Sequence, residues 1–398
     1  MKIKKAIKLR LYPSQDKQKQ INQIREICLW LYNYLGKERI KAWKQSLSEG
    51  LKENKTKVTY TQQQNLLPQL KETNPDLKLV HSQTLQDVVR RLDYSWKKFY
   101  TKVKKEKVGL PRRKWLEKYE SFTYTQSPAF QLKGSQLWIS KLGWINIRKH
   151  REPMGEVKTC SLLIKNQKYY AVFSCEVEAQ PKTTVSSISP QKQIGIDVGI
   201  GKDNFFALSN GVKQANPQFY RTAEKELGEL QRKVSSKEKR SQRREKAKLE
   251  LSKKHENVSN QRKDFVFKVV KKLRDNFDLL AVEKLRTRKI MERSQEQNPW
   301  YSAKSLHDAS LSFFLLALSH RVEETGGRLV KVNPAYTSQR CSNCQQLASR
   351  KLELSDRVFV CACCKHKEDR DINAAKNILY QAQITELGTN FDSQNKIW

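Results

Sequence analysis

The chain has 398 residues, a length that suits two or three domains and allows a substantial hydrophobic core. Lys and Arg number 78 and Asp and Glu number 41, so the formal net charge is +37. A charge of this size opposes compaction unless an anionic partner neutralises it, and we expect nucleic acid in preference to a membrane surface.

The sequence indicates neither membrane insertion nor secretion. Its longest apolar run, 313–318, is far too short to span a bilayer. The basic N-terminus is not followed by the apolar stretch of a signal peptide. Five of the eight cysteines lie between residues 341 and 364, which is metal-ligand spacing and not a secreted disulfide framework. We therefore expect a cytoplasmic, nucleoid-associated protein with no membrane partner and no small-molecule substrate.

The N-terminal part begins with a strand pattern and continues with helical patterns. Residues 3–12 alternate between apolar and polar side chains, and Pro13 ends the alternation. Ser14 can cap a following helix, and a polar stretch at 48–60 separates that helix from further helical sequence. The apolar residues with helical spacing are Ile21, Ile24, Cys28, Leu31 and Leu35 in the first helix and Leu85, Val88, Leu92, Trp96 and Phe99 in the later one.

From about Ser121 the apolar period changes to two, which predicts an antiparallel β unit reaching residue 178. The isolated strand at 3–12 needs partners, so we expect it to join this unit. The helices of 14–118 would then be an insertion into a barrel or sheet. Residues 182–190, rich in Ser, Thr and Pro, read as a linker and a domain boundary.

The stretch 191–211 predicts a β-hairpin with an acidic residue on its first strand. Ile194 and Ile196 precede Asp197, and the apolar run 205–208 follows a Gly- and Asn-containing turn. An ionised carboxylate on an apolar strand requires a metal ion or a counter-ion if it is buried. Alternatively, Asp197 simply ends the strand as a turn residue.

The next segments are a basic helical region and a second acidic strand end. Residues 223–275 form a long helical pattern dense in Lys and Arg, either a solvated helical hairpin or a positively charged wall along a phosphate backbone. Residues 278–283 predict a buried strand ending in Glu283, which could also pair with Lys284 or Arg286. A helix at 305–325 and a strand at 328–332 follow.

The cysteines predict a structural zinc site. The spacing C-x2-C-x16-C-x2-C suits four thiolates in a closed tetrahedron around one Zn²⁺. Cys363 and His366 are spare candidates, but using either one breaks the paired C-x2-C pattern. The proposed ligands are Cys341, Cys344, Cys361 and Cys364.

A short helix with Asp371 in its first turn follows the cysteines, and the helix dipole alone would favour an acid there. Together with Asp197 and Glu283, however, Asp371 suggests an RNase H-like active site. Two Mg²⁺ ions about 3.5–4 Å apart need several carboxylate ligands. One ion would activate a water molecule, and both would stabilise charge developing on a phosphodiester.

Several stretches carry a family resemblance over nearly the full length. They are KLRLYP at 8–13, KLGWINIR at 141–148, GIDVGI at 195–200, AVEKL around Glu283, GRLVKVNPAYTSQRCSNC at 327–344 and FVCACCKHKEDRDINAAKNIL at 359–379. With them the sequence resembles TnpB, the family of RNA-guided DNA endonucleases of bacterial insertion sequences related to type V CRISPR effectors.

The resemblance implies an α+β multidomain fold with two lobes. A RuvC nuclease domain would occupy 191–337 and 367–398, with a zinc ribbon inserted at 338–366. In the N-terminal lobe, a helical recognition domain at 14–118 would interrupt a wedge-like β-barrel formed by 1–13 and 119–181.

The resemblance also implies an activity. Asp197, Glu283 and Asp371 would be the catalytic acids and the Mg²⁺ ligands, with Asp369 as the alternative to Asp371. The partners would be a guide RNA from the transposon end and double-stranded target DNA. Both strands would be cut at one site beside a short motif, while base pairing reads the sequence.

Two departures from the family pattern and three competing functions remain at this point. Gln345 and Lys365 stand where the family usually has Gly after each second cysteine, and the spacer around Asn298-Pro299-Trp300 is irregular. The competing functions are a nuclease-inactive RNA-guided repressor, a transposase acting by strand transfer, and a zinc-ribbon transcription factor.

Overall fold

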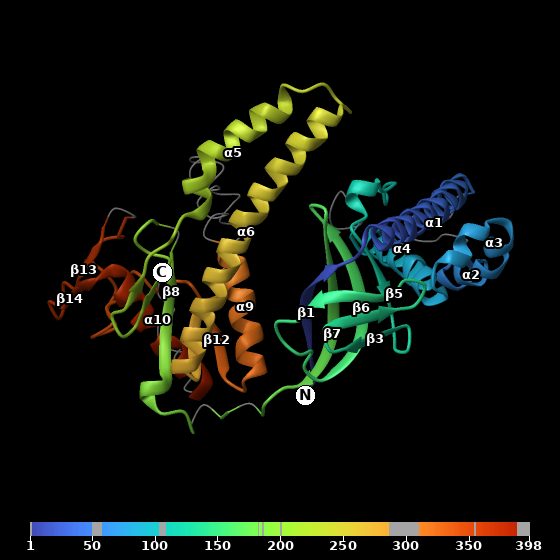
Figure 1. Ribbon diagram of the computed structural model, residues 1–398. Helices are drawn as coiled ribbons and strands as arrows, with labels where there is room; N and C mark the ends of the chain where they lie inside the picture. The colour runs from blue at the N-terminus through green and yellow to red at the C-terminus, as the bar shows by residue number, and fades with distance from the viewer. Residues whose placement is uncertain are drawn as a thin grey trace. The chain divides into compact units, whose positions relative to one another are not determined.

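A computed structural model shows two compact units, divided between Glu178 and Ala179 (Figure 1). Both combine helices and strands, which confirms the expected α+β, multidomain organisation. None of the described helices combines the length and the apolar character that crossing a bilayer requires. The structure describes residues 2–49, 58–102, 109–181, 183–184, 187–199, 201–285, 310–353 and 356–387.

The first unit contains a seven-stranded antiparallel sheet in the order β2-β6-β7-β1-β5-β4-β3. Strand β1 lies in the middle, with Ile7 opposite Phe173 of β7 and Leu11 opposite Ile147 of β5. The prediction that the N-terminal strand joins the later β unit is confirmed. The strands are β1 (Lys2–Tyr12), β2 (Ser121–Tyr124), β3 (Phe130–Lys133), β4 (Gln136–Ile139), β5 (Gly143–Arg148), β6 (Glu156–Lys165) and β7 (Lys168–Glu178).

The helices between β1 and β2 pack against this sheet. The hydroxyl oxygen of Ser14 accepts a hydrogen bond from the Lys17 amide and caps α1, as predicted. The predicted apolar faces of α1 and α4 are buried in the same hydrophobic core as the strands, so helices and sheet form one unit. The helices are α1 (Gln15–Ser48), α2 (Tyr60–Asn65), α3 (Leu67–Thr73) and α4 (Ser82–Lys102), with short 3₁₀ turns η1 (Pro75–Leu79) and η2 (Leu116–Lys118).

The second unit is built on a five-stranded mixed sheet in the order β10-β9-β8-β11-β12. Strands β8 and β9 form the predicted antiparallel hairpin, whereas β8, β11 and β12 run parallel. A 3₁₀ turn, η4 (Pro190–Lys192), leads into the sheet. The strands are β8 (Gln193–Val198), β9 (Phe206–Leu208), β10 (Lys213–Gln214), β11 (Leu279–Glu283) and β12 (Arg328–Val332).

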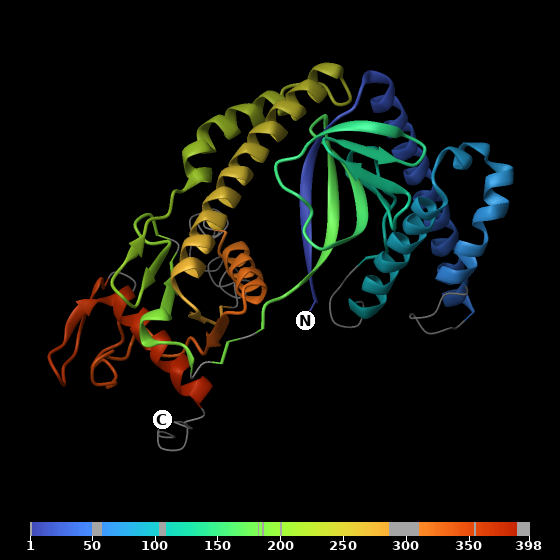
Figure 2. The ribbon, with the colours of Figure 1, turned by 60° about the horizontal axis from the view of Figure 1, so that its bottom comes forward.

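Helices cover both faces of this sheet. Apolar side chains of α6 (Gln242–Asn276) and α9 (Leu311–Glu324) pack on one face, and α10 (Arg370–Leu387) packs on the other. Helix α5 (Phe219–Ser235) lies beside α6, so the basic helical pattern forms a hairpin (Figure 2). The predicted helix at 305–325 begins at Leu311, and its first residues, 305–309, lie outside the described part of the chain.

Gly195 lets α10 lie directly on β8. A Cβ atom at this position would collide with the carbonyl oxygen of Ala375 and lie 2.9 Å from the Cβ and amide nitrogen of Leu379. Because most of this obstruction is helix backbone, only a glycine allows the observed spacing between strand and helix. Gly195 therefore sets the position of α10 on the sheet.

Replacing Gly195 with Ala is expected to destabilise the second unit by about 1–3 kcal/mol or more, since the helix must move. Thermal unfolding should show a lower Tm, by about 2–4 °C for each kcal/mol. Gly201→Ala is the matched control, because its Cβ would meet nothing within 4 Å. Equal melting temperatures for the two variants would contradict the close packing of α10 on β8.

Candidate active site and metal centre

The first two candidate acids lie side by side at the carboxyl ends of parallel strands. Ile196 of β8 is in register with Val282 of β11, so the next residues, Asp197 and Glu283, are neighbours. Side chains alternate along a strand, and Ile196 and Val282 both point into the core beneath α6 and α9. Asp197 and Glu283 therefore point to the opposite face, toward α10. This edge is where ligands bind in open sheets with parallel strands.

The third acid reaches the same place from the helix. Gly195, which contacts Ala375, is two residues before Asp197 on the same face of β8. Asp371 is one helical turn before Ala375, so it lies over the end of the strand, next to Asp197. Burial, followed by the charges of Glu283 and Asp371, raises the pKa of Asp197 well above its usual range. The structure thus brings the three carboxylates within electrostatic reach of one another.

Two side chains from the β8–β10 region hold Asp371 by one oxygen. Asn204 Nδ2 donates a hydrogen bond to Asp371 Oδ2 at 2.8 Å, and Lys213 Nζ lies 3.5 Å from the same atom. Asn204 packs closely against Gly199, because a Cβ atom at position 199 would lie 2.6 Å from the carbonyl oxygen of Asn204. These contacts hold one oxygen of the Asp371 carboxylate.

Asp369 has a different role from Asp371. Its Oδ1 accepts hydrogen bonds from the amides of Asp371 and Ile372, which makes it the cap of α10. Its Oδ2 is 2.6 Å from Lys213 Nζ. Burial alone would raise the pKa of Asp369, but the bond from Lys213 and the two amides lower it. Asp369 is thus engaged in local structure.

Glu283 is also held by one oxygen. The hydroxyl of Thr337 donates a hydrogen bond to Glu283 Oε1. Burial raises the pKa of Glu283, and the bond from Thr337 partly offsets this effect. Thr337 is buried, and its own carbonyl oxygen accepts a hydrogen bond from Asn377 of α10. The strand end and the helix are therefore linked through one residue.

The three carboxylates offer the kind of ligands that hard divalent cations prefer. All three are partly exposed, and Asp371 and Glu283 each have a second oxygen beyond the one held by Asn204 or Thr337. Carboxylate oxygens suit Mg²⁺, which usually takes one or two of them and keeps several waters. Burial and, after it, repulsion by Glu283 and Asp371 raise the pKa of Asp197, and a bound cation would relieve this repulsion.

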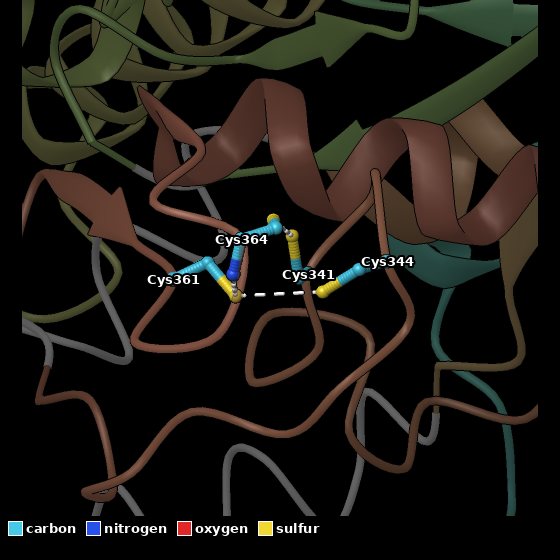
Figure 3. Close-up of side chains that lie close together, drawn as sticks. All are labelled: Cys341, Cys344, Cys361 and Cys364. Carbon is cyan, nitrogen blue, oxygen red and sulfur yellow. Dashed lines mark hydrogen bonds between the residues drawn. The ribbon is translucent and has the colours of Figure 1, made fainter.

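Four cysteines form a second, tighter cluster. The sulfurs of Cys341, Cys344, Cys361 and Cys364 all lie within 4.8 Å of one another and point inward (Figure 3). The Cys341–Cys364 and Cys344–Cys361 sulfur pairs are 3.6 and 3.5 Å apart. A zinc–sulfur distance of about 2.3 Å in a tetrahedron requires sulfurs about 3.8 Å apart, so the four sites fit one Zn²⁺.

The spare candidates stand outside this cluster. Cys363 is exposed, and the imidazole of His366 lies 3.4 Å from a carboxylate oxygen of Glu368. Gln345 and Lys365 have φ angles of +62° and +58°, the left-handed conformation that favours glycine. The knuckle turns therefore keep the glycine geometry although both residues carry side chains.

The cysteine cluster is attached to α10 by two buried asparagines one turn apart. Asn373 Oδ1 accepts a hydrogen bond from the Ser342 amide at 2.8 Å, and both Asn373 and Asn377 donate to the carbonyl oxygen of Arg340 at 2.7 Å. Sequence reasoning missed these residues, as it missed Thr337 and Asn204. Two asparagines four residues apart in a helix are a usable signal, since Asn is a poor helix former and must find partners when buried.

The α5–α6 hairpin carries an excess of positive charge. Helix α6 has twelve basic and five acidic residues. Two lysines pair with glutamates of the facing helix, Lys233 with Glu250 and Lys254 with Glu226. Part of the charge therefore joins the two helices, and Arg274 at the end of α6 is bound to Asp278 and Thr325.

Comparisons with known proteins agree with this arrangement of motifs. A model of the OrfB/IS605 family, described as "Probable transposase", matches residues 173–294, and a helix-turn-helix model of the same family matches 1–48. A model described as "Cas12f1-like, TNB domain" matches residues 313–378, which include the cysteine cluster.

The relatives include two curated bacterial proteins. "Putative RNA-guided DNA endonuclease InsQ" of Escherichia coli (strain K12) is 27% identical over 76% of this chain and 75% of the relative. "Putative RNA-guided DNA endonuclease" of Streptomyces pristinaespiralis is 28% identical over 95% of this chain and 89% of the relative.

A solved structure shares the fold. One chain of the "Cryo-EM structure of the Cas12f1-sgRNA-target DNA complex" is 13% identical, with a TM-score of 0.55 over 95% of this chain and 98% of that chain. The family models and the two curated relatives agree, and the shared fold is consistent with them: this is a TnpB-like protein, similar to OrfB/IS605 proteins over most of its length.

Proposed function

We propose that this protein is an RNA-guided DNA endonuclease that hydrolyses phosphodiester bonds at a site formed by Asp197, Glu283 and Asp371. The observation that carries the proposal is the meeting of three carboxylates at one edge of the β8–β11 sheet. The net charge of +37 supports two polyanionic partners, a guide RNA from the transposon end and double-stranded target DNA. The names of the two bacterial relatives support the same activity.

The residues of the chain would act by positioning and charge. Asp197, Glu283 and Asp371 would hold two Mg²⁺ ions, which supply an activated water and neutralise charge at the scissile phosphate. Thr337 and Asn204 would each fix one carboxylate oxygen and leave the other directed at the shared site. Such preorganisation lowers the cost of assembling ligands at the moment of reaction. Hydrolysis by this route needs no covalent bond to the protein.

The other parts of the chain would have separate roles in cleavage, stability and nucleic-acid binding. The nuclease domain would comprise 191–337 and 367–398, joined through the linker at 182–190 to the N-terminal lobe. One Zn²⁺ on the four cysteines would stabilise a ribbon at 338–366. In the N-terminal lobe, a wedge-like barrel (1–13 and 119–181) and the helices of 14–118 would contact the nucleic acids. Base pairing would choose the target, and one site would cut both strands beside a short motif.

The test is plasmid cleavage by the protein with its co-purified RNA and Mg²⁺. Sequencing that RNA supplies the target sequence for the plasmid. Linear product that disappears after RNase treatment or after Asp197→Ala is the expected result. A wild-type protein that binds the matched plasmid but cuts no better than Asp197→Ala would instead identify a guided repressor.

Strand transfer is the second candidate, favoured by the family description "Probable transposase". Three acids on such a sheet can serve transesterification as well as hydrolysis. This reaction would produce joined DNA strands and would not depend on RNA. Joined products that persist after RNase treatment would establish it in place of guided hydrolysis.

Thr337→Val is expected to slow cleavage by about 10- to 100-fold, the range found when a residue that orients a metal ligand is lost. Valine has a similar shape but cannot donate the hydrogen bond to Glu283 Oε1. The Mg²⁺ concentration for half-maximal cleavage should rise, and Thr337→Ser should restore both values. A slower rate with unchanged Mg²⁺ dependence would mean that Thr337 does not orient a metal ligand.

A further inference from the structure

An aromatic and basic cavity lies in the first unit, far along the chain from the carboxylates. It has a volume of about 410 Å³ and is lined by residues of α1, α4 and the segment that precedes η2. This volume is within the range of about 300–1,000 Å³ that is typical of ligand sites. The lining residues used below are Trp30, Tyr34, Lys37, Arg112 and Arg113.

Two aromatic rings form an open wall of this cavity. Trp30 and Tyr34, one turn apart on α1, stack with centroids 5.1 Å apart and planes inclined by 15°. They are 40% and 39% exposed, although α1 buries its other face in the core. Large exposed aromatic rings that lie parallel are a platform on which a further flat ring can stack.

Three cations line the same cavity as the two aromatic rings. Lys37, Arg112 and Arg113 line the cavity, and no acidic residue does so within the described part of the chain. Arg113 also lies over the ring of Trp115, with its Cζ 5.3 Å from the centroid. The cavity therefore combines surfaces for a flat apolar ring with charges for an anion.

The segment that carries the arginines is fixed to α1 beside the cavity. Asn33 Nδ2 donates to the carbonyl oxygen of Lys114 and Asn33 Oδ1 accepts from the Lys114 amide, both at 2.9 Å. The Lys114 ammonium is 4.3 Å from the centroid of the Tyr32 ring. These contacts hold the segment that carries the arginines against α1 before any ligand arrives, which reduces the entropy cost of binding.

We propose that this cavity binds an unpaired nucleotide of RNA, with its base stacked on Trp30 and Tyr34 and its phosphates next to Lys37, Arg112 and Arg113. A nucleotide is the ligand that combines a flat ring with negative charge. Unpaired bases are displayed by the loops and bulges of folded RNA, whereas the bases of duplex DNA are stacked and must first be separated. The site is independent of the carboxylates and rests on the proposed function only in that RNA is the partner.

The test measures the binding of fluorescein-labelled oligo(A) RNA by fluorescence anisotropy in the absence of Mg²⁺. The RNA has about twelve nucleotides, which is within the usual site sizes of proteins that bind single strands. The full-length protein is first freed of co-purified nucleic acid in high salt. The double variant Trp30→Ala, Tyr34→Ala should bind this RNA about tenfold more weakly, the loss of one stacked base. Its affinity for a duplex RNA of the same length should change less than about twofold.

Three variants serve as controls. Trp30→Phe with Tyr34→Phe keeps two flat rings and should retain affinity. Tyr94→Ala removes a more exposed ring on α4, 60% exposed and outside the cavity, and should bind like the unchanged protein. Arg112→Gln should weaken binding. It should also reduce the magnitude of the slope of log affinity against log salt concentration by about 1, as expected for the loss of one phosphate contact and not for a structural effect.

Each outcome decides the proposal. An equal loss for duplex and single-stranded RNA would overturn it, as would unchanged affinity of the double Ala variant. If the double Ala variant loses more affinity for oligo(dA) DNA than for oligo(A) RNA, the site binds a separated DNA strand and the proposal is wrong. A protein that binds no RNA at all would count against the proposed function as well, whereas RNA binding indifferent to Trp30 and Tyr34 counts against this cavity alone.

Discussion

Glu283→Gln is expected to reduce DNA cleavage on the order of 10⁴-fold, the size of loss seen when one member of a catalytic unit is removed. The substitution preserves shape, and the amide oxygen of Gln can still accept the hydrogen bond from Thr337. What it removes is the negative charge that a divalent cation requires. Cleavage of a matched plasmid at saturating Mg²⁺ measures the effect, and RNA binding should be unchanged.

The controls separate a chemical role from a structural one. Glu323→Gln makes the same change at an exposed position of α9 and should leave cleavage unaltered. Asp371→Asn should match Glu283→Gln, whereas Asp369→Asn should retain most activity, because an Asn can also cap α10. If Glu283→Gln loses cleavage and RNA binding together, the acid supports the fold and the proposed chemistry is wrong.

Replacing Cys341 with Ser should remove the bound zinc and unfold the ribbon. The apolar core of the ribbon is small, with Cys341, Phe359 and Cys361 as its buried members. So small a core cannot hold the segment by itself, and structural Zn²⁺ supplies about 10–16 kcal/mol of apparent free energy in comparable sites. Metal analysis of the purified protein should show about one zinc per chain before the change and none after it.

The same variant should lose cleavage although the ribbon is not at the carboxylates. Arg340, just before the cluster, provides the carbonyl oxygen that Asn373 and Asn377 bind, and Asn377 also binds Thr337. Unfolding the ribbon would release these contacts and, with them, the hydrogen bond that fixes Glu283. Limited proteolysis should cut within 338–366. Cys363→Ser, at the exposed cysteine, should keep both zinc and activity, and zinc loss there would reject the ligand set.

The patterns that repeat over short stretches predicted the elements correctly. The alternation in 3–12, the helical spacing after Ser14 and the hairpin around Asp197 appear as β1, α1 and β8–β9. The side chains that face the core repeat every two residues in a strand and every 3.6 residues in a helix, so each segment shows its own type of secondary structure. The local sequence was therefore sufficient to predict these elements.

Two features needed the packed structure. The basic pattern of 223–275 forms a helical hairpin, one of the two arrangements that the sequence allowed, and the chain turns back between Ser235 and Gln242. The helices of 14–118 share one core with the β unit, although their patterns resemble a separate helical domain. The apolar face of a helix shows that it must be buried and does not show against what. The irregular spacer at 298–300 lies outside the described residues.

The sequence alone pointed to the three acids as candidates and predicted the paired cysteines and the strands and helices that carry them, because each of these signals lies within a few tens of residues. Only the tertiary structure decided which side chains hold those acids in place. Thr337 reaches Glu283 across 54 positions, and Asn204 reaches Asp371 across 167. Such pairs leave no local period or spacing, since they arise only when strand, hairpin and helix pack on one sheet, and Gly195 allows α10 to come close enough to complete that packing.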